Sequence, residues 1–164
     1  MKKNEIELIA ELLKDSRQSD RTIGKTLGVS QPTVSRTRAK LEKDRVILRY
    51  SFIPDLTRLG FELLAITTAS VKVLGDKKMQ EKAVAYLKDV PNVLYSARAQ
   101  GMGKDAIIIS VHSDFTDYEN FAVKLKQDWI NVIENIESIL VSLKGFTIKH
   151  FSMGDLGKIL SQPE

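Results

Sequence analysis

The chain has 164 residues, of which 43% are hydrophobic and 28% are charged, and it contains no cysteine. This length corresponds to one domain or two small ones. The absence of cysteine excludes a disulfide framework, a cysteine-ligated zinc finger and a thiol nucleophile. No uncharged stretch is long enough for a transmembrane helix, and the first residues turn acidic instead of running into an apolar signal segment. We therefore expect a soluble, cytoplasmic protein.

The positive charge is concentrated in the first third of the chain. Residues 1–50 hold 12 Lys and Arg against 7 Asp and Glu, a net charge of +5. The remaining residues hold 13 and 14 of these, a net charge of −1. Such an asymmetry favours a polyanion-binding end joined to a neutral end.

Helical periodicity covers most of the first 44 residues. Apolar side chains recur at helical spacing over 5–14, Ser19 is placed to cap a second short helix, and a third runs from Gln31 to about Asp44. In the second helix Gly24 would let another helix approach closely, and Gly28 is suited to end the helix in a left-handed conformation. Two helices joined by a short turn that contains glycine form a helix-turn-helix unit, which places its second helix in the major groove of DNA.

The outer surface of the third helix carries groups that read DNA. Between Gln31 and Leu41 the chain has three cations and no anion. Gln can read adenine, Arg can read guanine, and Ser or Thr can reach bases or phosphates. The alternative is an ordinary three-helix bundle with one basic face. The candidate DNA-binding residues are Ser30, Gln31, Thr33, Ser35, Arg36, Arg38, Lys40, Lys43 and Arg49, of which Gln31, Ser35 and Arg36 are expected to read bases and Arg38, Lys40, Lys43 and Arg49 to hold phosphates.

Residues 5–60 resemble the Lrp/AsnC family of transcription regulators, in its archaeal-type form. The resemblance rests on the segments Ile9–Leu13, Leu27–Ser30, Val34–Arg36, Leu41–Ile47 and Leu59–Gly60. It implies a winged helix-turn-helix domain joined by a hinge strand to a βαββαβ ferredoxin-like (RAM-type) domain for oligomerisation and effector sensing. One departure is Arg45, which stands where the family usually has Gly; in a left-handed conformation a non-glycine residue costs on the order of 1 kcal/mol.

The second part of the chain alternates between strand and helix periodicity. After an extended hinge over 45–54, the pattern predicts the strand 63–73, the helix 76–88, the strands 93–99 and 106–111, the helix 117–129 and the strand 136–143. This order predicts an α+β fold in which an antiparallel sheet carries both helices on one face. The expected division is a DNA-binding domain (1–50), a hinge (51–61), a βαββαβ domain (62–150) and a tail (151–164) with at most a short helix.

The uncovered face of that sheet would have to be buried, so we expect a homodimer through the C-terminal sheet. Tetramers or octamers are implied by the resemblance alone. In the family a G-x-x-D turn between the second and third strands helps form an amino-acid effector site. The corresponding candidate residues are Gly101, Met102, Gly103, Lys104 and Asp105, although the spacing differs by one residue. The alternative is a β-hairpin turn that needs glycine for its positive φ.

The sequence favours a sequence-specific DNA-binding transcriptional regulator that binds pseudo-palindromic operators of double-stranded DNA, and not an enzyme. One alternative is an architectural protein that coats DNA, against which the modest net charge of +4 argues. Another is a siroheme-decarboxylase-like enzyme, a class that resembles this family in fold. The two histidines, His112 and His150, are far apart and have no carboxylate at ligand spacing, so we expect neither a metal nor another cofactor.

Overall fold

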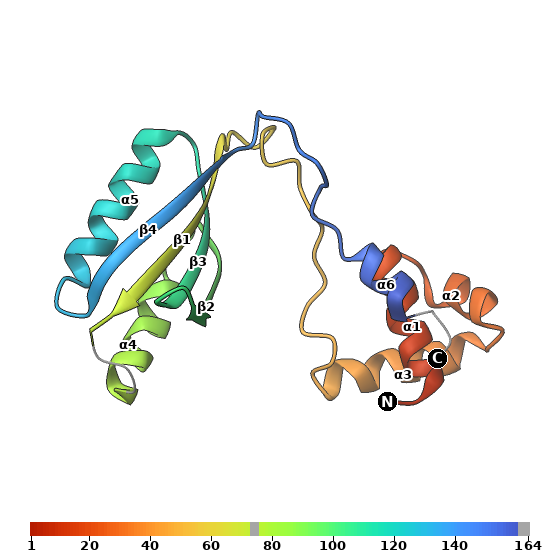
Figure 1. Ribbon diagram of the computed structural model, residues 1–164. Coiled ribbons are helices and arrows are strands. Elements are labelled where there is room, and N and C mark those ends of the chain that lie inside the picture. Colours follow the sequence, from red (N-terminus) through yellow and green to blue (C-terminus); the bar gives the residue numbers. More distant parts are fainter. Residues whose placement is uncertain (73–75, 161–164) are drawn as a thin grey trace. The chain divides into compact units, whose positions relative to one another are not determined.

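The chain folds into two compact units, seen in a computed structural model that describes residues 1–72 and 76–160 (Figure 1). The first unit comprises Met1–Ile53 and the C-terminal residues from Lys149 onward, and the second comprises Pro54–Ile148. Within the described residues no helix is both long and apolar enough to cross a membrane.

Three helices form the body of the first unit: α1 (Lys3–Lys14), α2 (Asp20–Leu27) and α3 (Gln31–Lys43). Their boundaries have local causes, because the hydroxyl of Ser19 accepts the N–H of Thr22 and that of Ser30 accepts the N–H of Thr33. At the other end, α2 stops at Gly28, whose φ of 69° lies in the left-handed region. The helix-turn-helix predicted from the sequence is confirmed.

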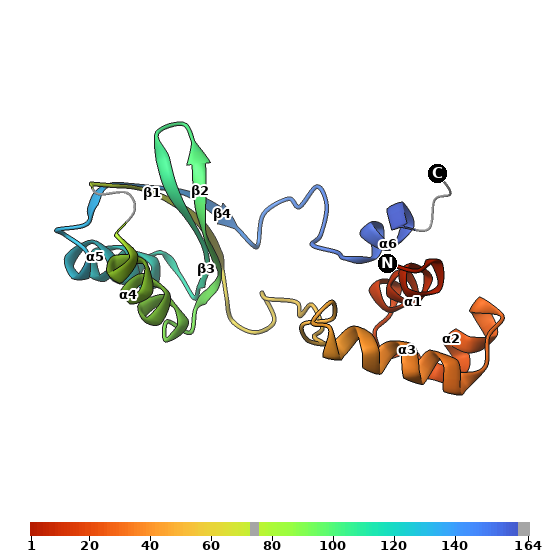
Figure 2. The same cartoon turned by 90° about the horizontal axis from the view of Figure 1, so that it is seen from below.

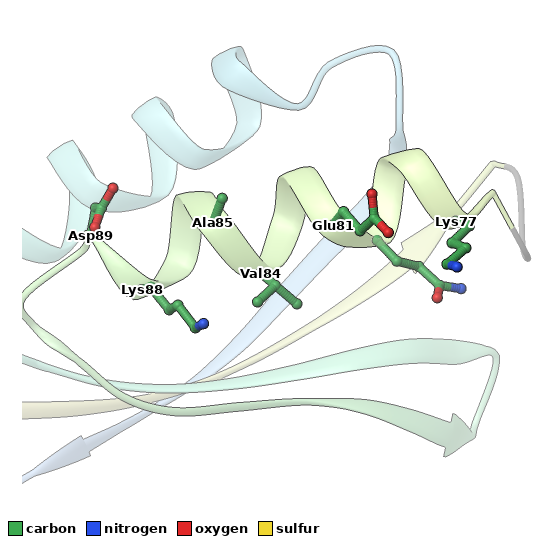
Figure 3. Close-up of a pocket in the computed structure, with 7 residues that line it drawn as sticks. Lys77, Glu81, Val84, Ala85, Lys88 and Asp89 are labelled. Atoms are coloured by element: carbon green, nitrogen blue, oxygen red, sulfur yellow. The ribbon is translucent and has the colours of Figure 1, made fainter.

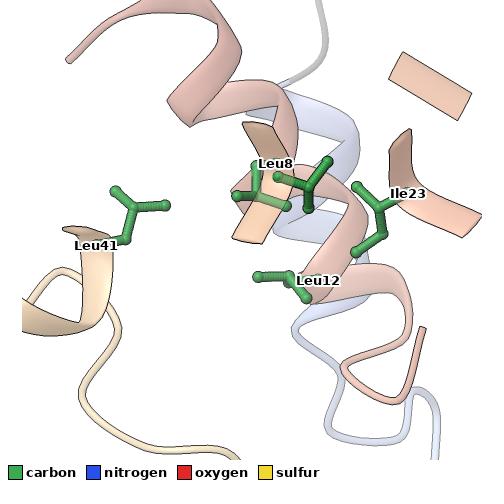
Figure 4. Close-up of a cluster of buried hydrophobic side chains, with 5 residues drawn as sticks. Leu8, Leu12, Ile23 and Leu41 are labelled. Carbon is green, nitrogen blue, oxygen red and sulfur yellow. The ribbon is translucent and has the colours of Figure 1, made fainter. Parts of the chain in front are cut away.

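The three helices enclose one hydrophobic cluster (Figure 4). Its fully or nearly fully buried members are Leu8, Leu12, Ile23, Val34 and Leu41. Beside this cluster, Gly24 allows the close approach expected from the sequence. A Cβ atom at Gly24 would lie 2.8 Å from the carbonyl oxygen of Val29 and 3.5 Å from the backbone nitrogen of Gln31, so the turn before α3 and the first residue of α3 approach here.

A fourth helix, α6 (Gly154–Leu160), returns from the C-terminal end of the chain and packs along α1 (Figures 1 and 2). A Cβ atom at Gly157 would lie only 2.8 Å from the carbonyl oxygen of Ala10, so the two helices approach closely where Gly157 has no side chain. Gly154 faces the same helix near Leu13. Because glycines make this contact, hydrophobic periodicity could not reveal how the tail is packed.

The second unit is a four-stranded antiparallel sheet in the order β2-β3-β1-β4. The strands are β1 (Leu63–Val71), β2 (Val93–Gly101), β3 (Lys104–His112) and β4 (Ile133–Ser142), and the helices are α4 (Lys77–Lys88) and α5 (Phe115–Asp128). Both helices lie on the same face of the sheet (Figure 2). The predicted βαββαβ order and ferredoxin-like fold are therefore confirmed.

The segment expected to form an extended hinge strand is not a strand among the described residues. Residues 45–54 pair with no strand of the described chain. An extended segment becomes a strand only when a neighbouring strand takes up its backbone hydrogen bonds. The composition of a segment favours an extended backbone, but it does not show whether such a neighbouring strand is present.

One buried polar side chain in the sheet unit is His112, at the end of β3. Its imidazole is fully buried against the rings of Tyr118 and Phe121, with Nε2 at 2.9 Å from the hydroxyl of Ser110. Burial lowers the pKa of His112 from its ordinary value of 6.5, although Asp117, at 3.3 Å from Nδ1, opposes that change. The folded sheet therefore holds a neutral histidine.

We expect the sheet unit to lose stability as the pH falls below about 6.5. The unfolded chain then takes up a proton that the folded chain resists, so the free energy of unfolding decreases by at most about 1.4 kcal/mol per pH unit for this group. Urea unfolding at pH 7 and pH 5.5, followed by the fluorescence of Trp129, measures the effect. His112→Gln should flatten the dependence and His150→Gln, at an exposed position, should not. Equal slopes in all three proteins would contradict this assignment.

Candidate DNA-binding site

The outward face of α3 is the centre of the candidate site. Gln31, Ser35, Arg36, Ala39 and Lys43 are all exposed, whereas Val34 and Leu41 on the opposite face are buried in the core. The Nε of Arg36 donates to the carbonyl oxygen of Pro32 at 3.3 Å, so the Arg36 side chain folds back toward the N-terminal end of α3. In a helix-turn-helix this end of the second helix reaches base edges.

Ser30 and Thr33 fix the start of α3. Their hydroxyl oxygens lie 2.8 Å apart, and the Ser30 hydroxyl also accepts the N–H of Thr33. Thr33 is half-buried, while Ser30 is exposed. Both residues were expected to contact DNA. In the structure Ser30 is the N-cap of α3, and Thr33 is its hydrogen-bond partner.

Arg38 is held inside the unit. Its guanidinium binds the carboxylate of Asp20 at 2.6 Å, donates to the carbonyl oxygen of Gln18 at 3.4 Å and lies over the ring of Tyr50. Only 17% of the side chain is exposed. Burial lowers the pKa of Arg38, but the hydrogen bonds with Tyr50 and Asp20 raise it by more than burial lowers it. The pKa therefore lies above its ordinary value, and the guanidinium stays charged. The sequence suggested a phosphate ligand here, whereas this geometry ties α3 to the start of α2.

Lys40 is also paired, but it remains accessible. Its Nζ lies 2.5 Å from Oε1 of Glu5, and this hydrogen bond lowers the pKa of Glu5. The Glu5 side chain is nearly buried, whereas 54% of the Lys40 side chain is exposed. Lys40 therefore links α3 to α1 and still presents its charge to solvent.

Several cations of the first unit are exposed and make no ion pair among the residues that the structure describes. Lys43 and Arg49 belong to the set expected from the sequence. The set expected from the sequence did not include others, among them Arg17, Arg21, Lys25 and Arg45. The spacing of Arg21 and Lys25, four residues apart on the first helix of the helix-turn-helix, was the available signal, since that helix crosses the DNA backbone.

The loop proposed for effector binding is the hairpin between β2 and β3. Met102 and Gly103 both have positive φ, 52° and 69°, as a two-residue hairpin turn requires. Lys104 pairs with Glu137 at 2.8 Å, and the carboxylate of Asp105 accepts the N–H of Val71 at 2.9 Å. Both charges are thus engaged within the sheet, while the Met102 side chain is 98% exposed.

A separate depression lies on α4 (Figure 3). Every side chain that lines it comes from this helix or from Asp89 directly after it. Lys77, Glu81 and Lys88 project from one helix with no second element to enclose a ligand. It is the exposed face of a helix and not a binding site.

The helix pair, the exposed cationic face of α3 and the capped turn define a helix-turn-helix DNA-binding protein. The sequence profile of the AsnC-type helix-turn-helix domain matches residues 6–42. The transcriptional regulator LrpC of Bacillus subtilis is 33% identical over 103 residues, which cover 62% of this chain and 69% of LrpC. The chain belongs to the Lrp/AsnC family of DNA-binding transcriptional regulators.

Two further comparisons extend over most of the chain. The regulator PH0061 of Pyrococcus horikoshii is 29% identical over 140 residues, which cover 84% of this chain and 90% of the relative. The crystal structure of PH0061 superposes with a TM-score of 0.78 at 25% identity, over 93% of this chain and 97% of that structure. A Neisseria meningitidis regulator solved with L-methionine shares the fold, with a TM-score of 0.77 at 18% identity over 92% and 93% of the two chains.

Proposed function

We propose that the protein represses or activates transcription by reading a specific operator through the N-terminal half of α3. The single observation that carries this proposal is the exposed face of the N-terminal half of α3, where Gln31, Ser35 and Arg36 stand together and no acidic residue occurs before Glu42. Gln and Arg supply bidentate contacts to adenine and guanine, and Ser adapts to either a base or a phosphate. Ala39 adds an exposed methyl group of the kind that contacts thymine.

Phosphate contacts are assigned to the accessible cations around this face, which are Lys40, Lys43 and Arg49. Arg21 and Lys25 extend the same charge along α2. Arg38 is assigned a positioning role, because its ion pair with Asp20 sets how α2 meets α3. Ser30, which caps α3, and its hydrogen-bond partner Thr33 are assigned contacts with the DNA backbone at the start of α3.

Arg36→Ala tests the reading of sequence. Loss of a bidentate contact should weaken binding to the preferred site by about 1 to 3 kcal/mol and leave binding to random DNA nearly unchanged. Fluorescence anisotropy with both DNAs measures the difference, and Lys124→Ala, at an exposed position on α5 of the sheet unit, is the matched control and should bind both DNAs normally. Equal loss on both DNAs would show that Arg36 does not specify sequence.

We further propose that the protein acts as a homodimer, or a larger homo-oligomer, formed through the open face of the sheet. The strand register places an apolar row across all four strands on this face, formed by Tyr95, Ile109, Ile66 and Ile139. At the two edges, Tyr95 and Ile139 are 54% and 67% exposed. A second copy of the same row would remove this surface from water. A dimer of this kind would present two recognition helices to half-sites about one helical turn apart.

Ile139→Glu tests the sheet interface. A carboxylate within a dry contact must be desolvated without a partner. The dissociation constant of the dimer should therefore rise by at least about a hundredfold, which corresponds to roughly 3 kcal/mol. Sedimentation velocity distinguishes dimer from monomer. Ile130→Glu, at an equally exposed position outside the sheet, should leave the assembly unchanged. A dimeric Ile139→Glu protein would exclude this face as the interface.

An amino-acid-like effector is proposed at the β2–β3 hairpin, which comprises Gly101, Met102, Gly103, Lys104 and Asp105. The Neisseria relative was solved with L-methionine, which supports a ligand of this class. Lys104 and Asp105 already have partners, and Gly101 pairs with Lys104 between β2 and β3. The part of the hairpin left to meet a ligand is therefore the turn Met102–Gly103. Thermal shift measurements with the individual amino acids test the proposal, and a set without any shift would contradict it.

The domain roles follow from this assignment. We propose that residues 1–50 bind DNA, that 51–61 form the hinge, and that 62–150 assemble the protein and sense the effector. The tail, residues 151–164, is proposed to serve the DNA-binding unit, since α6 packs on α1.

A further inference from the structure

We propose that Arg45, in the turn that follows α3, binds a phosphate of the DNA backbone at the far end of the recognition helix. This inference rests on the proposed function, because it requires α3 to lie against DNA. It adds a backbone contact at a position that the sequence marked only as a departure from glycine.

The turn after α3 forces Arg45 into an unusual backbone conformation. The N–H of Val46 donates to the carbonyl oxygen of Leu41 at 2.9 Å, and the N–H of Arg45 donates to that of Glu42 at 3.1 Å. These two bonds form a Schellman motif, in which the residue between them is left-handed and is usually glycine. Arg45 has a φ of 57°. The strain is thus imposed by hydrogen bonds that close the helix.

The preceding helix, α2, also ends with a left-handed residue, and there that residue is glycine. Gly28 ends α2 with a φ of 69°, and no atom lies within 4 Å of where its Cβ would be. Space is therefore available at Gly28, so the backbone conformation is what favours glycine there. At the end of α3 the chain carries a large cation in that conformation. Strained residues of this kind gather at functional sites.

Stabilisation of the helix is an insufficient reason for this cation. A positive charge does favour the C-terminal end of a helix, but Lys40 and Lys43 already occupy the last turn of α3. Among the residues that the structure describes, the Arg45 side chain has neither an ion pair nor a hydrogen bond, and the residue is exposed. Its charge is available to an external anion.

The position suits a phosphate. α3 has 13 residues and is therefore roughly 20 Å long, whereas the major groove is about 12 Å wide. A helix that enters the groove at its N-terminal end has its C-terminal turn near the flanking backbone, as the third helix of homeodomains does. Residues 42–49 carry three basic side chains, Lys43, Arg45 and Arg49, against two acidic ones, Glu42 and Asp44. Glu42 accepts a hydrogen bond from Tyr50, so the turn still presents more positive than negative charge to that backbone.

The test measures folding and DNA binding in the same variants. Arg45→Gly relieves the backbone strain and should raise the melting temperature by roughly 4 °C or more. It should also weaken the binding of promoter and scrambled DNA alike, by roughly fivefold per subunit at 0.15 M salt, and reduce the log–log salt slope by about 0.9 per subunit. Arg45→Asn removes the charge and introduces a residue that tolerates the left-handed conformation, so it should weaken DNA binding to a similar extent. Arg45→Lys should retain the slope.

Two outcomes overturn the inference. If Arg45→Gly and Arg45→Asn both keep the wild-type salt slope, Arg45 does not contact phosphate, whatever the melting temperature does. If the wild-type protein binds neither DNA, the proposed function fails and this inference fails with it. The two are distinguished by Arg36→Ala in the same assay, because loss of promoter preference in that variant supports the proposed function even when the Arg45 variants bind normally.

Discussion

Replacing Ile23 by alanine is expected to unfold the DNA-binding unit while the sheet unit stays folded. Ile23 is completely buried in the cluster that joins α1, α2 and α3 (Figure 4). Truncating such a side chain typically reduces the free energy of unfolding by about 2 to 5 kcal/mol. A unit of this size has only about 3 to 10 kcal/mol in total. DNA binding should therefore be lost at growth temperature.

The two units can be followed separately in this experiment. Trp129 is the only tryptophan of the chain and lies in the sheet unit, where its ring meets that of Tyr86. Its fluorescence should report an unchanged transition in Ile23→Ala, while circular dichroism at 222 nm reports an earlier loss of helix. Leu48→Ala, at a position that is 81% exposed, is the matched control and should leave both transitions unchanged. A Trp129 transition that moves with the helical one would mean that the units do not fold independently.

The second large effect is expected from Arg38→Ala. This change removes the ion pair with Asp20 and the hydrogen bond to the carbonyl oxygen of Gln18, and it leaves the Asp20 carboxylate largely buried without a partner. We expect the free energy of unfolding of the DNA-binding unit to decrease by about 2 kcal/mol, between the values for exposed and buried pairs. A double-mutant cycle with Asp20→Asn measures the pair itself.

DNA binding distinguishes this positioning role from direct contact. Well below its melting temperature, Arg38→Ala should show an unchanged salt slope, because Arg38 is assigned no phosphate. Lys43→Ala should lose about 0.9 from the slope per subunit with little change in stability. The opposite pattern, in which Arg38→Ala is stable but has a shallower slope, would make Arg38 a phosphate ligand.

Much of the fold could be predicted because its signals are local. The caps at Ser19 and Ser30, the glycine stop at Gly28 and the alternating periodicities lie within a few residues of the features that they determine. The packing of α6 could not be predicted in this way. It depends on a contact between Gly157 and Ala10, residues at opposite ends of the sequence, and neither has a side chain large enough to leave a hydrophobic pattern.

In the candidate site, too, local features could be predicted from the sequence, whereas contacts between distant residues could not. The sequence pattern predicted that the outer face of α3 is exposed, and Gln31, Ser35, Arg36 and Lys43 are indeed exposed. It could not show which cations have partners, because Arg38 pairs with Asp20 eighteen positions earlier and Lys40 pairs with Glu5 across the bundle. For the same reason the charges of Lys104 and Asp105 looked available for a ligand, although the neighbouring strands engage both.

The most direct test of sequence reading is the binding of the wild-type protein to its own promoter and to scrambled DNA, measured by fluorescence anisotropy across a salt series. With Lys40, Lys43, Arg45 and Arg49 on phosphates, a dimer should give a log–log slope of about −7. A sequence-reading regulator should prefer the promoter by roughly a thousandfold or more. Equal affinity for both DNAs at every salt concentration, as an architectural protein would show, would contradict the account.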